Sequence, residues 1–247
     1  MDLGPRVVTD AVALGWLLLC WLGYPRLMAG IDRRRRSINV DMLALRRAWM
    51  AGLLQRDFRV PDTALMGQVI QSVAFFASGT IIVVGALVGA LARVESLAAL
   101  SAGLMPGLSA SPQSMRLCLL VLLAIFVQGF FRFTWALRQH NYFVTMLGAA
   151  PMPPLEPGRH ARLADAMSCA LSLASSNFNA GLRSYYFGFA TLAWLIHPLL
   201  VPITTTLTIA VLVHRQFFSV TAATVAAVLA ELELAERPQP SHLSQLL

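Results

Sequence analysis

Polar side chains that could bind an anion lie along an apolar segment, residues 128–145. If this segment is helical, its polar residues recur every three or four positions in two adjacent stripes. The stripes contain Gln128, Arg132, Trp135 and Gln139, and beside them Thr134, Arg138, Asn141 and Thr145. Charged groups inside a bilayer usually face protein or water. We therefore expect either a functional polar cluster between helices or arginines that reach the headgroups from the end of a span.

The sequence SSNFNAGLRSYYF, residues 175–187, supplies a second polar group. Its members are Asn177, Asn179, Arg183, Tyr185 and Tyr186. Both groups are predicted at the cytoplasmic ends of their helices, so we expect that they can meet in one network. The alternative is an aromatic belt with an arginine anchor at the membrane interface.

Other kinds of chemistry are disfavoured by what the sequence lacks. From position 95 onward the acidic residues are Glu95, Glu156, Asp165, Glu231, Glu233 and Glu236, and none lies in a predicted span. A carboxylate proton relay or cation site is therefore disfavoured, and the excess of arginine favours an anion. No P-loop, G-x-S-x-G, H-E-x-x-H or C-x-x-C motif occurs. We expect no catalytic residue, no metal site and no cofactor.

Composition places the chain among membrane proteins. It is 57% hydrophobic and 13% charged, whereas about 25% of the residues in soluble domains are charged. A spanning helix needs about 20 mostly apolar residues, and four segments qualify: residues 8–29, 69–92, 117–137 and 185–213. We predict an all-α polytopic membrane protein, a bundle of four transmembrane helices with amphipathic surface helices. The membrane domain covers residues 1–219, and a C-terminal helix and tail cover 220–247.

Two predicted spans have features that suggest a role. Small residues in the second span (Ser78, Gly85 and Gly89) permit close helix packing, either within the chain or between subunits. We expect that the protein forms a homo-oligomer. The fourth span contains two prolines, and we expect one kinked helix; a re-entrant hairpin is the alternative. Three of its polar residues fall near one face and either cap the broken backbone or line a pore: His197, Thr204 and Thr208.

The distribution of arginine predicts the orientation. All 19 basic residues are arginine, and nine lie in the connection that runs from Arg26, near the end of the first span, to Arg59, before the second span. The positive-inside rule places that connection in the cytoplasm and the N-terminus outside; the C-terminus is outside with four spans and inside with a hairpin. Residues 37–57 have apolar positions at helical spacing, which indicates an amphipathic helix on the membrane surface. Next to it, Arg33, Arg34, Arg35 and Arg36 are expected to contact anionic headgroups of the bilayer, not nucleic acid.

Several phrases of the sequence resemble a known family. The most specific are FTWALRQHNY and GLRSYYFGFATLAW, and RRAWMAGLLQRDFRVPDT and SVAFFASGTIIVVGAL agree with them. The chain is similar, from about residue 15 to 219, to membrane proteins of the domain of unknown function 599. The resemblance implies a multi-pass membrane protein, and it assigns no activity and no catalytic residue.

These patterns give two expectations for function. The first is an inner-membrane, oligomeric, channel-like or transport subunit for a small solute, an anion in preference to a cation. The second is a non-transporting scaffold or lipid-interacting subunit of a larger complex. A membrane enzyme is the least favoured, because no nucleophile, base and metal occur together.

Overall fold

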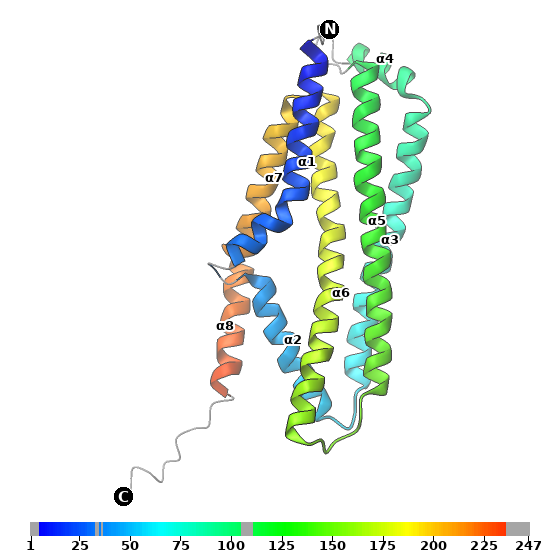
Figure 1. The fold of residues 1–247 in the computed structure, drawn as a ribbon. Helices are drawn as coiled ribbons and strands as arrows, with labels where there is room; N and C mark the ends of the chain where they lie inside the picture. Colours follow the sequence, from blue (N-terminus) through cyan, green and yellow to red (C-terminus); the bar gives the residue numbers. More distant parts are fainter. Residues whose placement is uncertain (1–4, 33–34, 36, 105–110, 236–247) are drawn as a thin grey trace, which may run out of the picture.

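The computed structural model describes residues 5–32, 35, 37–104 and 111–235. Its helices, coloured along the chain in Figure 1, are α1 (Pro5–Asp32), α2 (Ile38–Leu54), α3 (Val60–Leu91), α4 (Val94–Leu104), α5 (Pro112–Ala149), α6 (Pro157–Thr191), the 3-10 helix η1 (Leu192–Leu195), α7 (Leu200–Phe217) and α8 (Val220–Ala235). Arg33, Arg34 and Arg36, predicted to contact headgroups, lie outside the described residues. Arg35 places its guanidinium over the Phe218 ring, 5.2 Å from the ring centroid.

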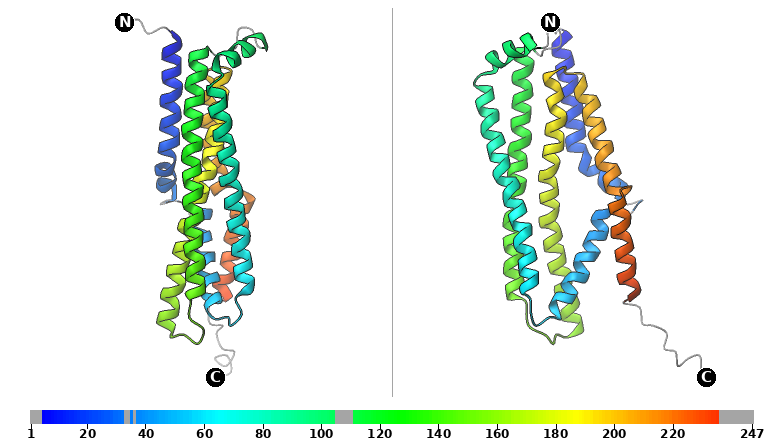
Figure 2. Two further views of the ribbon diagram at one scale, coloured as in Figure 1. Left: turned by 90° about the vertical axis from the view of Figure 1, so that its right-hand side faces the viewer. Right: turned by 180° about the vertical axis from the view of Figure 1, so that it is seen from behind.

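The helices form one elongated bundle with α6 in the middle (Figures 1 and 2). Helices α3, α5 and α6 run side by side over most of its length. At the end where α1 begins, which we call the outer end, α1 and α7 pack beside α6; α2 and α8 lie nearer the opposite, inner end. Helix α1 begins at the outer end, and α8 ends toward the inner end (Figure 1).

Four helical stretches are long and apolar enough to cross a membrane, which confirms the predicted class. They are Val7–Asp32, Val60–Leu91, Pro112–Ala149 and Leu200–Leu232. The first three contain or overlap the predicted spans. The fourth joins α7 and α8, and it begins later than we expected.

The structure divides residues 185–213 between two antiparallel helices, in place of the single kinked span that we expected. Helix α6 ends at Thr191, and α7 begins at Leu200 and runs back toward the inner end (Figure 1). Pro198 lies in the turn, and Pro202 lies in the first turn of α7, where a missing N–H costs no hydrogen bond. Thr204 Oγ1 donates to Ala190 O across the hairpin at 2.9 Å. The arrangement is closer to the hairpin alternative.

Helix α2 forms as predicted; Val40 and Leu43 in its first half are exposed, whereas the apolar residues near its end are buried in the bundle. Met50, Leu53 and Leu54 are fully buried in a core that also contains Phe143 of α5 and Met167 of α6. This inner core is separate from the outer core around Leu17, Phe187 and Trp194 (all fully buried). The bundle is therefore stabilised by two apolar cores, one above the other along α6.

Close packing occurs at glycines other than those we predicted. A Cβ on Gly181 would lie 2.6 Å from the Phe133 ring, and one on Gly188 would lie 2.8 Å from the Phe126 ring. Gly129 of α5 is similarly close to Ser184 of α6. These glycines bring α5 and α6 together. In contrast, Ser78, Gly85 and Gly89 lie on an exposed face of α3, and a Cβ on either glycine would meet nothing within 4 Å. They do not pack within this chain, and assembly of a homo-oligomer stays a prediction.

We predict that Gly181→Ala destabilises the bundle, although alanine favours a helix over glycine by about 1 kcal/mol. The added methyl meets the ring of Phe133, which is fully buried and stacked on Phe76. Overpacking of this kind costs about 1–3 kcal/mol. The measurement is the thermal unfolding midpoint of the protein in detergent. Gly85→Ala, with open space at its Cβ, is the matched control; equal midpoints for the two variants would contradict the assignment.

Candidate functional site

A buried polar cluster joins three elements at the outer end of the bundle. Asp10 Oδ1 accepts hydrogen bonds from Ser114 Oγ at 2.7 Å and from Trp194 Nε1 at 3.0 Å. Trp194 is fully buried, and the indole N–H is also 3.2 Å from Ser114 Oγ. The cluster ties α1 and α5 to η1, directly before the turn into α7. Asp10 lies near the start of the first predicted span, residues 8–29, and nothing in the sequence indicates these partners.

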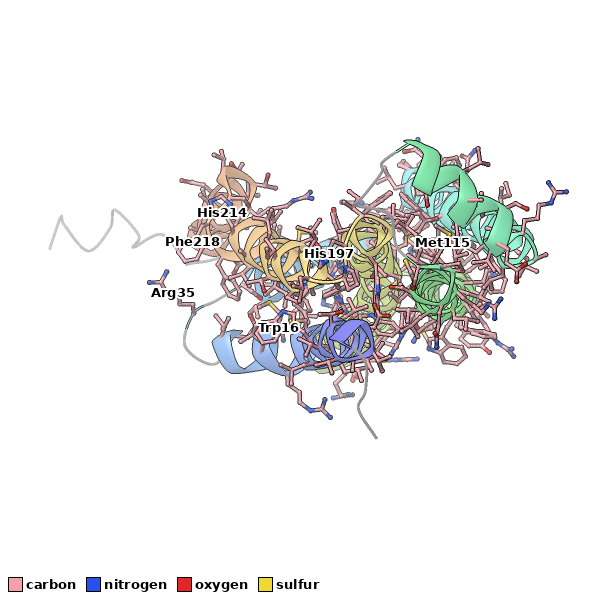
Figure 3. The ribbon with its side chains drawn as sticks, turned by 90° about the horizontal axis from the view of Figure 1, so that it is seen from above. Trp16, Arg35, Met115, His197, His214 and Phe218 are labelled. Atoms are coloured by element: carbon pink, nitrogen blue, oxygen red, sulfur yellow. The ribbon has the colours of Figure 1, made fainter. Side chains whose placement is uncertain are left out.

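The three candidate pore residues near the same turn have different surroundings. Thr204 bonds to backbone carbonyls, which is the capping role that we kept as an alternative. His197 is exposed, and its Nδ1 accepts a hydrogen bond from the Leu199 N–H. Thr208 is half-buried. Figure 3 looks down the bundle from this end and labels His197, together with Trp16, whose Nε1 donates to Thr206 of α7 at 3.1 Å.

The two predicted polar groups do meet along the α5–α6 contact. Arg132 Nη1 donates to Asn177 Oδ1 at 3.0 Å, and Asn177 Nδ2 donates to Gln139 Oε1 at 2.8 Å. Ser184 Oγ donates to Gln128 Oε1 at 2.9 Å. The prediction of an interhelical polar network is therefore met by Gln128, Arg132, Gln139 and Asn177.

The other members of the predicted cluster lie elsewhere. Tyr185 turns toward α3, where its hydroxyl lies 2.9 Å from Thr80 Oγ1. Arg138 pairs with Tyr142 on the exposed side of α5, and Asn141 is exposed. The remaining residues, Asn179, Arg183 and Tyr186, line cavities between α6, α2 and α7. The single cluster that we expected is thus divided between two sides of α6.

On that second side, α6 lines two adjoining cavities of about 330 and 240 Å³. The two share Asn39, Asn179 and Arg183. The first adds Arg46 of α2 and the serines of α6, and the second adds Arg215 of α7. We call this pair of cavities the basic basin, and define it by Asn39, Arg46, Ser172, Ser175, Ser176, Asn179, Arg183, Tyr186 and Arg215.

The arginines of the basic basin are held by neutral groups. Arg46 Nη1 donates to Ser172 Oγ at 3.3 Å, and Arg215 Nη1 donates to the Tyr186 hydroxyl at 2.7 Å. The Arg183 guanidinium lies 5.4 Å from the Tyr24 ring centroid, a cation–π contact. Burial lowers the pKa of Arg46 below its ordinary value, which reflects a charge that has lost water. Among the described residues, no carboxylate forms an ion pair with any of the three.

Helix α2 begins at the basin. Its first residues, Ile38 and Asn39, line the smaller cavity. Ser37 precedes them, but its buried hydroxyl makes no cap bond and has no hydrogen-bond partner. The first N–H groups of a helix carry a partial positive charge and bind anions. Among the residues that the structure describes, Asp32 is the one acidic residue lining the two cavities, and its Oδ1 has no hydrogen-bond partner there.

The comparisons with known proteins fit this membrane bundle. A family described as protein of unknown function, DUF599, matches residues 12–221. The chain belongs to this family. The match confirms the resemblance found in the sequence. It covers most of α1 and all of α2 to α7, and hence every residue of the basic basin. No curated protein and no solved structure matches this DUF599 chain.

Part of the basic basin of this DUF599 protein was within reach of the sequence. Ser172, Ser176, Asn179 and Arg183 recur at helical spacing and so share one face of α6. We expected Asn179 and Arg183 in the second polar group, but we did not recognise this stripe. Arg46 was counted for orientation alone, since nothing local to α2 indicates that it reaches α6.

We predict that Trp194→Phe lowers the unfolding midpoint of the detergent-solubilised protein by several degrees. The change removes a buried N–H that bonds to a carboxylate, and such bonds contribute about 1.5–3 kcal/mol. Trp16→Phe is the matched control, because its N–H bonds to an exposed hydroxyl. A midpoint for Trp194→Phe no lower than that of Trp16→Phe would show that the outer cluster does not stabilise the turn.

Proposed function

We propose that this DUF599 protein binds a small anion, carrying a phosphate or carboxylate group, in the basic basin. One observation carries the proposal: Arg46, Arg183 and Arg215 line adjoining cavities without an ion pair among the described residues. Arg46 and Arg183 are half-buried and Arg215 is exposed. A half-buried cation without a counter-charge has lost hydration free energy. A bound anion compensates for this lost hydration free energy. Guanidinium groups make charge-assisted hydrogen bonds to two oxygens of a carboxylate or phosphate.

The charge of the lining supports an anion that carries two negative charges. Among the described residues, three arginines and one aspartate, Asp32, line the cavities, a surplus of two positive charges. The first turn of α2 carries the buried Asp41, so we count no further positive charge from that helix. Hydrogen phosphate has the matching charge, and the neutral donors Asn39 and Asn179 can complete its hydrogen bonds. The nearby serines offer further donors.

The level of the basin supports access from the cytoplasm. Arg183 is adjacent to Ser184, which bonds to Gln128, about 24 Å along α5 from its first residue. This is near one face of a hydrocarbon layer about 30 Å thick. Helix α1 begins at the outer end and ends on this side of the bundle (Figure 1). The positive-inside rule assigns the arginine-rich segment that follows α1 in the sequence to the cytoplasm. We therefore place the protein in an inner membrane, with its N-terminus outside.

Transport of the anion is our second candidate, and it keeps the function expected from the sequence in a narrower form. Toward the outer end, the helices close around the fully buried Leu17, Phe187 and Trp194. The basin would then be open to one side only, which corresponds to one state of a carrier and not to an open channel. A scaffold that only senses the anion would not need a second conformation in which the basin opens to the outside.

We predict that inorganic phosphate binds to the purified protein in neutral detergent and that Arg183→Gln weakens this binding by roughly 10- to 100-fold. The loss follows from removing one charged hydrogen-bond partner, worth about 1.5–3 kcal/mol. Isothermal titration calorimetry gives the affinity, and Arg183→Lys should retain part of it. Arg93→Gln, at an exposed position between α3 and α4, is the charge-matched control. Equal binding by Arg183→Gln and Arg93→Gln would refute the assignment.

Uptake of labelled phosphate into proteoliposomes separates the two candidates. We expect uptake that depends on Arg183 and is unchanged in Arg93→Gln. Binding without uptake under any imposed gradient would favour an anion-dependent scaffold over a transporter.

A further inference from the structure

A separate site lies on the opposite side of α6 from the basic basin, on the exposed face of α5. A shallow cavity of about 570 Å³ is lined there by Ala124, Val127, Gln128, Phe131, Arg132 and Trp135. We call it the α5 niche. We propose that the α5 niche binds one anionic phospholipid, with its phosphate on Arg132 and an acyl chain along Val127 and Ala124.

The polarity of the niche changes along α5 as it does along a phospholipid, from an apolar end to a charged end. The end nearer the outer face is formed by the small apolar side chains of Ala124 and Val127. The other end has the guanidinium of Arg132 and the amide of Gln128, and Phe131 and Trp135 lie on either side of the arginine in sequence. Phe131 is 65% exposed and Trp135 is 48% exposed on a helix apolar enough to span a membrane, so both rings face lipid.

The depth of Arg132 fits a headgroup. It lies about 30 Å along α5 from Pro112, a distance equal to the usual thickness of the hydrocarbon layer. Trp135 follows one turn later, at the level where tryptophan is enriched in membrane proteins. The guanidinium and the indole therefore reach the plane of the lipid phosphates, while Val127 and Ala124 remain among the acyl chains.

The guanidinium is oriented before any lipid binds. Arg132 Nη1 donates a hydrogen bond to Asn177 Oδ1. The side-chain amide of Asn177 donates in turn to Gln139 Oε1, which holds it in place. No other hydrogen bond or ion pair from Arg132 is found among the described residues. Its remaining N–H groups are available for a phosphate, and a pre-oriented guanidinium loses less entropy on binding than a free one. An arginine that only snorkels would accept the phosphate of any lipid, whereas an uncompensated, fixed charge favours a lipid with net negative charge.

Native mass spectrometry of the detergent-solubilised protein tests the proposal, with phosphatidylglycerol and phosphatidylcholine as competing probes. We expect one phosphatidylglycerol per chain to be retained, at least fivefold in preference to phosphatidylcholine. Arg132→Gln should remove that preference, and Arg132→Lys should keep part of it because the charge remains. Val127→Trp should displace the lipid by filling the niche with no change in charge.

Two further variants distinguish Arg132 from other arginines of the bundle. Arg138→Gln removes a charge from the same helix outside the niche, and it should retain the preference for phosphatidylglycerol. Arg183→Gln, which alters the basic basin, should also retain it, so the two sites are tested independently. Equal retention of the two lipids by the unaltered protein, or an unchanged preference in Arg132→Gln, would overturn the proposal.

Discussion

The structure depends on the shielding of one polar helix. Helix α6 carries asparagines, serines and an arginine in the part of its length that lies beside the apolar helices α1, α5 and α7. Exposure of these groups to hydrocarbon would leave them without hydrogen-bond partners, each at a cost of several kcal/mol. The helix is therefore placed in the middle of the bundle, and its neighbours cover it. Glycines at the α5–α6 contact let the two backbones approach closely enough for Asn177 and Ser184 to bond to α5.

This central position gives α6 two sides with different chemistry. Toward α5, its polar groups are paired in short hydrogen bonds between neutral amides, a hydroxyl and Arg132. Toward α2 and α7, it lines cavities in which the arginines contact only neutral partners. The first side stabilises the bundle. The second side has unused donors and surplus positive charge, and for that reason we assign ligand binding to it.

The two apolar cores explain how a basin can exist beside a membrane-embedded bundle. The outer core fixes α1 and α7 to α6, and the inner core fixes α2 to α6. The basin lies between the regions that these cores stabilise, where α1 ends and α2 begins. Cavities at such a junction cost less than cavities within a core, because no close-packed apolar contacts are lost.

The sequence by itself determined the class of the protein, the existence of most of its helices and its family. Long apolar runs and the asymmetric arginines are local properties, and they hold whatever the neighbours of each helix are. The meeting of Arg132 and Gln139 with Asn177 was also within reach, since both stripes lie on predicted helices at the same membrane face. Helical periodicity also places Arg183 in a polar stripe of α6, although we did not recognise that stripe in the sequence.

Only the tertiary structure decided which helix face meets which partner. It turned the chain back between Thr191 and Leu200, buried the apolar residues of α2 against α6 and left Gly85 and Gly89 exposed. It also brought Asp10 to Trp194 and Arg46 to Ser172, pairs that are 184 and 126 residues apart. The physical reason is that periodicity defines the faces of a helix but not its neighbours. Neighbours are selected by the burial of polar groups and by close packing over the whole bundle, and no local pattern encodes either.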